Sequence, residues 1–230
     1  MKRFLIALSV VALLAGCTCS VNLGQGFGGG KRVVCKGPVK DRLLENLSGF
    51  DKIRVSGQAD LKYVQTTDEY VRVKANAEVF DYLDFEVDDA TLVIKTKDGV
   101  QIKADEFDVY VGSKVLKSLK VSGAADVDLS HINSAEDLTV SISGAGDCDM
   151  RDIKVPCLTY SVSGAGNLEA EGLDVEKLYV NISGAGDVDL AGKAGYASLS
   201  VSGAGDIDAR RLDCPQIEKK KSGVASIKTK

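Results

Sequence analysis

The sequence predicts an all-β solenoid, a single-stranded parallel β-helix with about 20 residues per coil. The first observation is a repeated motif, whose five copies read SGAAD, SGAGD, SGAGN, SGAGD and SGAGD and begin at Ser122, Ser143, Ser163, Ser183 and Ser202. Neighbouring copies lie 19 to 21 residues apart, and a worn sixth copy begins at Ser222. The chain also has 24 glycines and no tryptophan, which favours tight turns over an aromatic core.

Apolar residues recur at every second position within each copy, which is the second main observation. In one copy they are Leu178, Val180 and Ile182, followed by Val188 and Leu190. Such alternation predicts strands with one buried face. Leucine-rich repeats have the same period, but their leucine-asparagine signature and helical limb are missing here. Coils of a parallel β-helix, stacked about 4.8 Å apart, fit better.

The two glycines of SGAG are predicted to turn a corner of the coil. A side chain at a stacked corner would meet its copies in the coils above and below, whereas glycine allows close packing and positive φ. We therefore interpret these glycines as steric rather than ligand-binding.

The N-terminal residues predict export and a lipid anchor. Residues 1–16 have a basic start at Lys2 and Arg3, then an apolar run too short to span a bilayer, and they are expected to be a lipoprotein signal peptide. The LAGC ending at Cys17 resembles the bacterial lipoprotein box, so Cys17 is the expected lipidation site and the membrane a partner through that anchor. Residues 17–40, rich in glycine, are expected to form a flexible tether.

The β-helix domain is expected over residues 41–230. Residues 119–230 hold the regular SGAGD repeats, and residues 41–118 are expected to form irregular coils, about three of them between the early copy at Ser56 and Ser122. A helix is expected in PVKDRLLENL near residue 40. Lys219, Lys220 and Lys221 on the last strand should discourage pairing with another molecule, so the array is expected to end there.

Charge argues against a nucleic-acid partner. Cleavage before Cys17 removes Lys2 and Arg3, so 27 basic residues face 33 acidic ones and the formal net charge moves from -4 to -6. A nucleic-acid partner would call for a basic face.

Phe50 to Lys230 resembles the bacterial family called the putative auto-transporter adhesin head GIN domain. The resemblance rests on FDKIRVSGQADLKYVQ, on FDVYVGSKVLKSLKVSGAADVDL and on the SGAGD units. It implies a right-handed parallel β-helix, and adhesion is the role usually suggested for the family. It implies no catalytic residues.

An acidic face is the strongest candidate site. One predicted column holds Asp126, Asp147, Asn167, Asp187 and Asp206, and a second, two residues along, holds Asp128, Asp149, Glu169, Asp189 and Asp208. Like charges about 4.8 Å apart repel, so the columns should be neutralised by lysine, by protonation or by cations. Carboxylate clusters suit calcium, so weak Ca²⁺ binding is one hypothesis and a solvated or Lys-neutralised face is the other. No cofactor is otherwise expected.

The remaining candidates for chemistry are weak. Glycosidases use a pair of carboxylates, but here the carboxylates repeat in every coil, whereas an active site is a local irregularity. His131 is the only histidine and is expected on the surface. Cys148 should be buried, Cys157 and Cys214 should lie too far apart for a disulfide, and Cys19 with Cys35 remains open.

These observations lead to a lipid-anchored β-helix on the bacterial cell envelope, with the outer membrane as the expected location. The expected function is non-enzymatic adhesion or interaction with an unknown carbohydrate or protein ligand. The alternatives are a divergent polysaccharide-active enzyme and a structural envelope protein with weak divalent-cation binding.

Overall fold

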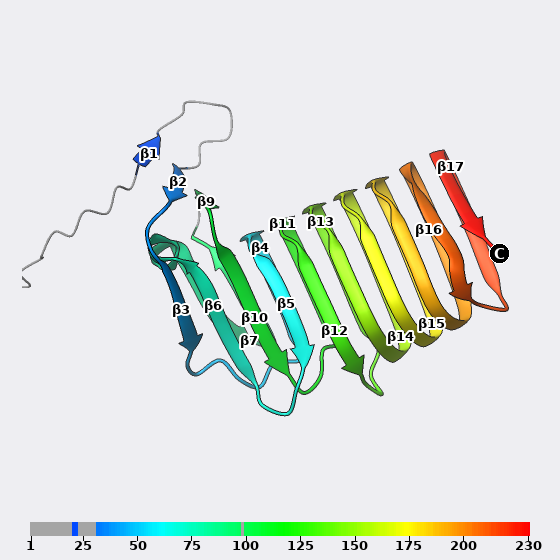
Figure 1. The fold of residues 1–230 in the computed structure, drawn as a ribbon, viewed down its shortest axis with the longest axis horizontal. Helices are drawn as coiled ribbons and strands as arrows, with labels where there is room; N and C mark the ends of the chain where they lie inside the picture. The colour runs from blue at the N-terminus through cyan, green and yellow to red at the C-terminus, as the bar shows by residue number, and fades with distance from the viewer. Residues whose placement is uncertain (1–19, 23–30, 98) are drawn as a thin grey trace, which may run out of the picture.

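The computed structural model describes residues 20–22, 31–97 and 99–230, which form almost entirely β-strands (Figure 1). The short strands are β1 Ser20–Asn22, β2 Lys31–Cys35, β3 Val39–Leu44, β4 Lys52–Gln58, β5 Asp60–Gln65, β6 Tyr70–Asn76, β7 Leu83–Asp88, β8 Thr91–Thr96, β9 Val100–Ala104, β10 Phe107–Ser113, β11 Ser118–Ala124, β12 Val127–Asn133 and β13 Leu138–Ala145. The long strands are β14 Cys148–Ala165, β15 Leu168–Ala185, β16 Val188–Asp213 and β17 Ile217–Thr229. A single 3₁₀ helix, η1, spans Ala77–Tyr82 within the described chain.

The predicted stack of parallel coils is confirmed over the repeats. Strands β11, β13, β14, β15, β16 and β17 pair in parallel, each with the next. The motif serines are in register along the stack, with Ser143 beside Ser163 and Ser163 beside Ser183. The sixth, less regular copy of the motif also belongs to the stack, because Ser222 pairs with Ser202.

The core is a column of aliphatic side chains inside the coils. Leu178, Val180 and Ile182 are almost completely buried, as are the residues at the same places in the neighbouring coils. The alternation seen in the sequence thus places one apolar row inward in β11, β13, β14, β15 and β16, and each row packs on its copies about 4.8 Å away.

The corner glycines have the steric role that the repeat predicted. A Cβ atom on Gly164 would lie 2.1 Å from the carbonyl oxygen of Gly144 in the preceding coil, and one on Gly184 would lie 2.0 Å from that of Gly164. Both glycines also have positive φ, 135° and 136°. No other residue fits both requirements without moving the backbone.

Chain order and stacking order differ at the N-terminal end of the solenoid, which corrects the expectation of three coils between Ser56 and Ser122. Strand β11 pairs directly with β4, and Ser122 lies beside Ser56. The intervening chain instead stacks on the other side, where β8 pairs with β4 and β10 pairs with β5. The coil at 52–65 is therefore inserted between the coils at 91–113 and 118–133 (Figure 1).

Antiparallel strands cover this end of the solenoid. Strand β7 pairs with β8, and β6 pairs with β10 on one side and with β3 on the other. The helix expected near residue 40 is wrong, since Val39–Leu44 is the edge strand β3. Its Asp41 accepts a hydrogen bond of 2.7 Å from Nε of Arg72 on β6, so a tertiary contact overrides the local apolar pattern.

Ordered structure reaches further towards the N-terminus than the expected tether, 17–40, allows. Strand β2 pairs with β1 and with β9 in a separate three-stranded sheet. Strands β1 and β2 thus lie within the stretch expected to be a tether. The predicted signal peptide, 1–16, and the lipidation site Cys17 lie outside the described residues. The part of the chain that the structure describes contains no helix long and apolar enough for a bilayer span.

The C-terminal coil has the charged edge that the lysines predicted. Lys219 and Lys221 lie beside Leu199 and Val201, at the places where other coils have aliphatic core residues, and both lysines are exposed. Within the described chain, β17 pairs only with β16. Addition of another coil at this end would bury these ammonium groups, which is costly.

Candidate functional site

The outer surface of the serine-bearing strands is hollowed into a groove of about 580 Å³, which we call the serine groove. Its lining residues come from β4, β11, β13, β14, β15 and β16 and are Arg54, Ser56, Lys120, Val121, Ser122, Ser141, Ile142, Ser143, Ser161, Val162, Ser163, Asn181, Ile182, Ser183, Ser200 and Ser202.

Two columns of polar side chains run along the serine groove across successive coils. One column consists of the exposed motif serines, such as Ser143 and Ser163. The other lies two residues earlier in each strand, with Ser161 beside Asn181. Residues on the same face of stacked parallel strands repeat about every 4.8 Å, so the groove offers evenly spaced hydroxyl and amide groups.

Charge is confined to the ends of the second column. Ser141, Ser161, Asn181 and Ser200 occupy its four central coils, whereas Arg54 and Lys120 hold the same place in the two coils before Ser141 and Lys220 holds it after Ser200. All three of these basic residues are exposed. The second column is thus neutral in the middle and basic at both ends.

The first predicted acidic column is a ladder of hydrogen bonds between coils. The side chain of each member accepts a bond from the backbone N–H of the next, and this holds from Asp126 to Asp147, Asn167, Asp187 and Asp206, each at 3.0 Å. Asp60 stands at the start of the same row, because Leu61 pairs with Val127. The side chains of this column therefore link neighbouring coils by hydrogen bonds.

Arginine side chains neutralise much of the second acidic column. Arg151 lies 3.5 Å from Asp128 and 3.3 Å from Asp149. Arg210 donates from Nε to Asp208 at 3.0 Å, and hydrogen bonds from its side chain and backbone lower the pKa of Asp208 to about 2. Arginine thus takes the part that the sequence assigned to lysine, although Lys228 also lies 3.5 Å from Asp206.

No group of three or more His, Cys, Asp or Glu side chains among the described residues is arranged to hold a metal ion. The paired carboxylates of the acidic face are spread along the stack rather than gathered round one point. Weak calcium binding to this face stays a prediction.

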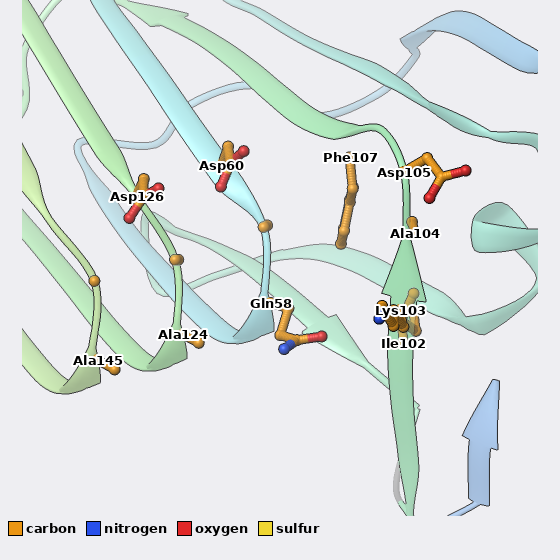
Figure 2. A pocket seen from close by; sticks show the side chains of 13 residues that line it. Gln58, Asp60, Ile102, Lys103, Ala104, Asp105, Phe107, Ala124, Asp126 and Ala145 are labelled. Carbon is orange, nitrogen blue, oxygen red and sulfur yellow. The ribbon is translucent and has the colours of Figure 1, made fainter. Parts of the chain in front are cut away.

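A pocket of about 470 Å³ lies at the corner of the inserted coil, and we call it the corner pocket (Figure 2). It is lined by Gln58, Ala59, Asp60, Ile102, Lys103, Ala104, Asp105, Phe107, Ala124, Ala125, Asp126, Ala145 and Gly146. In the repeats each corner rests on the next, for example through the 3.2 Å bond from the N–H of Gly146 to the oxygen of Ala165. At 99–106 the chain leaves the stack, because β9 pairs with β2 in the separate sheet, and the corner at 58–60 is left open.

The corner pocket contains Asp60, the member of the acidic row whose pKa is raised. Partial burial raises the pKa of Asp60, and the nearby negative charge of Asp126 raises it further. Phe107, half-buried against the core, stands between Asp60 and the β9 segment (Figure 2). The pocket therefore combines an aromatic ring, an acid pair and the amide of Gln58.

The other predicted residues lie where the sequence placed them. His131 is on the surface, 3.2 Å from Asp152. Cys148 is completely buried, which raises the pKa of its thiol, and Cys157 and Cys214 are free. The pairing of Cys19 with Cys35 stays a prediction, since Cys19 lies outside the described residues.

The tyrosines do not form a sugar-stacking row. Tyr160 points into the core, whereas the half-buried Tyr179 and Tyr196 have ring centroids 6.0 Å apart. The two surfaces with the most binding potential, the serine groove and the corner pocket, were not identified from the sequence. The signal for the groove was present in the uncharged residues at 141, 161, 181 and 200. The pocket had no such signal, because it depends on the inserted coil.

Residues 49–230 match the family described as "Putative auto-transporter adhesin, head GIN domain". The chain belongs to the head GIN domain family. This confirms the family resemblance drawn from the repeats. No curated protein matches the chain.

Solved structures show the same fold as this head GIN domain. An adhesin described as putative from Parabacteroides distasonis is 25% identical, with a TM-score of 0.76, over 86% of this chain and 84% of that one. A putative lipid binding protein from the same species is 21% identical, with a TM-score of 0.77, over 87% of this chain and all of that one. A putative adhesin from Parabacteroides merdae is 23% identical, with a TM-score of 0.72, over 86% and 83%.

Proposed function

We propose that this protein is a lipid-anchored adhesion or interaction module of the bacterial cell envelope, which binds a carbohydrate or protein ligand in the serine groove without catalysis. The observation that carries the proposal is the neutral centre of the groove, where four consecutive coils present hydroxyl and amide groups in register. Such a surface can form hydrogen bonds to an extended ligand through its hydroxyl and amide groups and can bury the apolar area that lies between them. The family description supports adhesion as the role.

The binding test compares two surface variants of the mature chain on a glycan array and in capture from envelope extract. Ser163→Gln places a longer, uncharged side chain in the groove, and Glu169→Gln places the same residue on the acidic face. Both positions are exposed, so both variants should fold. We expect Ser163→Gln to weaken binding about ten-fold or more and Glu169→Gln to leave it unchanged. Equal binding by both variants would remove the groove from the proposal.

The anchor is tested separately. Mass spectrometry of the mature N-terminus should find acyl chains on Cys17, and Cys17→Ala should release the protein from the membrane fraction. Finding an unmodified N-terminus elsewhere would contradict the lipoprotein part of the proposal and leave the binding part standing.

A polysaccharide-cleaving enzyme is the second candidate function, and the corner pocket is the observation that favours it. Asp60 has a raised pKa beside Asp126, as a general acid beside a second carboxylate would need. However, Oδ1 of Asp126 is already engaged by the N–H of Asp147. Release of reducing ends from a polysaccharide panel, abolished by Asp60→Asn, would replace the non-enzymatic proposal.

A further inference from the structure

The corner pocket differs from the corners within the repeats, which rest on the next coil, because it is open on one side. The chain at 99–106 leaves the stack to form β9, so Ile102 and Lys103 face the corner of β4 and β5 from one side and no coil of the described chain is stacked on that corner (Figure 2). The opening is part of the fold, since it follows from the insertion of the coil at 52–65. The pocket shares no lining residue with the serine groove.

The lining of the corner pocket has an apolar part and a polar part. Phe107 is half-buried, and Ala59, Ala125 and Ile102 are buried. These side chains give the pocket a small apolar surface with one aromatic ring.

The polar part consists of hydrogen-bonding groups from two neighbouring coils. Asp60 begins β5, Asp126 immediately precedes its partner strand β12, and Gln58 lies two residues before Asp60 (Figure 2). A carboxylate accepts several hydrogen bonds, so Asp126 keeps acceptor capacity after its bond from Asp147. The amide of Gln58 can both donate and accept.

We propose that the corner pocket binds a neutral sugar residue, with Phe107 against its apolar face and with Asp60, Asp126 and Gln58 on its hydroxyl groups. A pyranose ring has C–H groups on one face and hydroxyl groups at its edge, which matches an aromatic surface beside acceptors and an amide. The volume, about 470 Å³, is in the range of small-molecule sites.

Charge makes the pocket selective for neutral sugars. Asp60, Asp105 and Asp126 line it against the single basic residue Lys103. A uronate or sulfated sugar would bring a further negative charge to a site where Asp126 already raises the pKa of Asp60. We therefore expect acidic sugars to be rejected.

The test measures binding of neutral oligosaccharides of glucose, galactose, mannose and N-acetylglucosamine to the mature chain by isothermal titration calorimetry. Oligomers of glucuronate and galacturonate of equal length are the acidic probes. Asp60→Asn removes a charged acceptor from the pocket, and Asp187→Asn makes the same change at an equivalent place in the ladder outside it. Asn167 already occupies one rung, so both variants should keep the fold.

We expect at least one neutral oligosaccharide to bind, Asp60→Asn to weaken that binding about ten-fold or more, and Asp187→Asn to leave it within about two-fold of the parent. Phe107→Leu, which keeps the core filled, should weaken it too. The inference is overturned if no neutral probe binds, if the uronate probes bind equally well, or if the two Asn variants behave alike. Loss of binding in Ser163→Gln but not in Asp60→Asn would also overturn it, while supporting the serine groove.

Discussion

Oδ1 of Asp147 accepts two hydrogen bonds from Asn167 in the next coil, one from the backbone N–H at 3.0 Å and one from the side-chain amide at 2.9 Å. The pair shows why this place in the repeat, which holds Asp in four copies and Asn in one, always provides a side-chain oxygen. We expect Asp147→Ala to lower the free energy of unfolding by about 1 to 2 kcal/mol, because the N–H of Asn167 loses its acceptor. Asp147→Asn should cost much less. Denaturant titration measures the free energy of unfolding of both variants. An equal decrease in the two would contradict a hydrogen-bonding role for Asp147.

Acid stability should depend on Arg210. Because Arg210 lowers the pKa of Asp208 to about 2 from its usual 3.8, the pair stabilises the fold above pH 4 and loses this effect as the pH falls towards 2. Arg210→Gln should therefore lower the melting temperature at pH 6 but hardly change it at pH 2. Lys193→Gln, at another exposed position, serves as the control. A constant difference across the pH range would speak against the assignment.

Tyr160 carries a hydroxyl group that is buried in the core without a hydrogen-bond partner among the described residues. Its inward neighbours in register are Val140 and Val180, which offer it no acceptor. Tyr160→Phe removes an unsatisfied polar group and should raise the free energy of unfolding by about 1 kcal/mol. Tyr179→Phe, at a half-buried position, should have little effect. A destabilised Tyr160→Phe would mean that the hydroxyl has a partner in solution.

Calcium should have a small effect on stability if the acidic face binds it. With a Kd near 1 mM, as in extracellular modules, 5 mM calcium would stabilise the fold by about 1 kcal/mol. The measurement is the melting temperature in calcium against chelator at equal ionic strength. Asp189→Asn should reduce the shift. Identical melting curves with calcium and with chelator would remove the hypothesis.

The regular half of the fold could be predicted because each coil repeats the same local pattern. Leu158, Tyr160 and Val162 alternate with polar residues just as Leu178, Val180 and Ile182 do, so the strands, their inward rows and their register follow from the spacing. The glycine corners follow as well, since Gly164 would clash with Gly144 if it had a side chain.

The irregular half could not be predicted in the same way. The distance of 66 residues between Ser56 and Ser122 is compatible with several coils in chain order, and nothing local reveals that the two serines are neighbours. Strand β3 shows the same limit, because only its pairing with β6 makes Val39–Leu44 extended. The corner pocket depends on long-range pairing of this kind. The sequence therefore shows each of its residues but does not predict that they lie together in one pocket.

The inserted coil brings Arg54 to the end of the serine groove and opens the corner pocket, so both binding surfaces depend on it. Disulfide cross-linking tests it most directly. Ser56 and Ser122 are register partners on adjacent strands, within reach of a disulfide, whereas Lys95 lies one strand beyond Ser56, about 9.6 Å from Ser122. Under mild oxidation, Ser56→Cys with Ser122→Cys should give a cross-linked tryptic peptide by mass spectrometry, and Lys95→Cys with Ser122→Cys should not. The opposite result would mean that the coils stack in chain order, which would contradict the inserted coil.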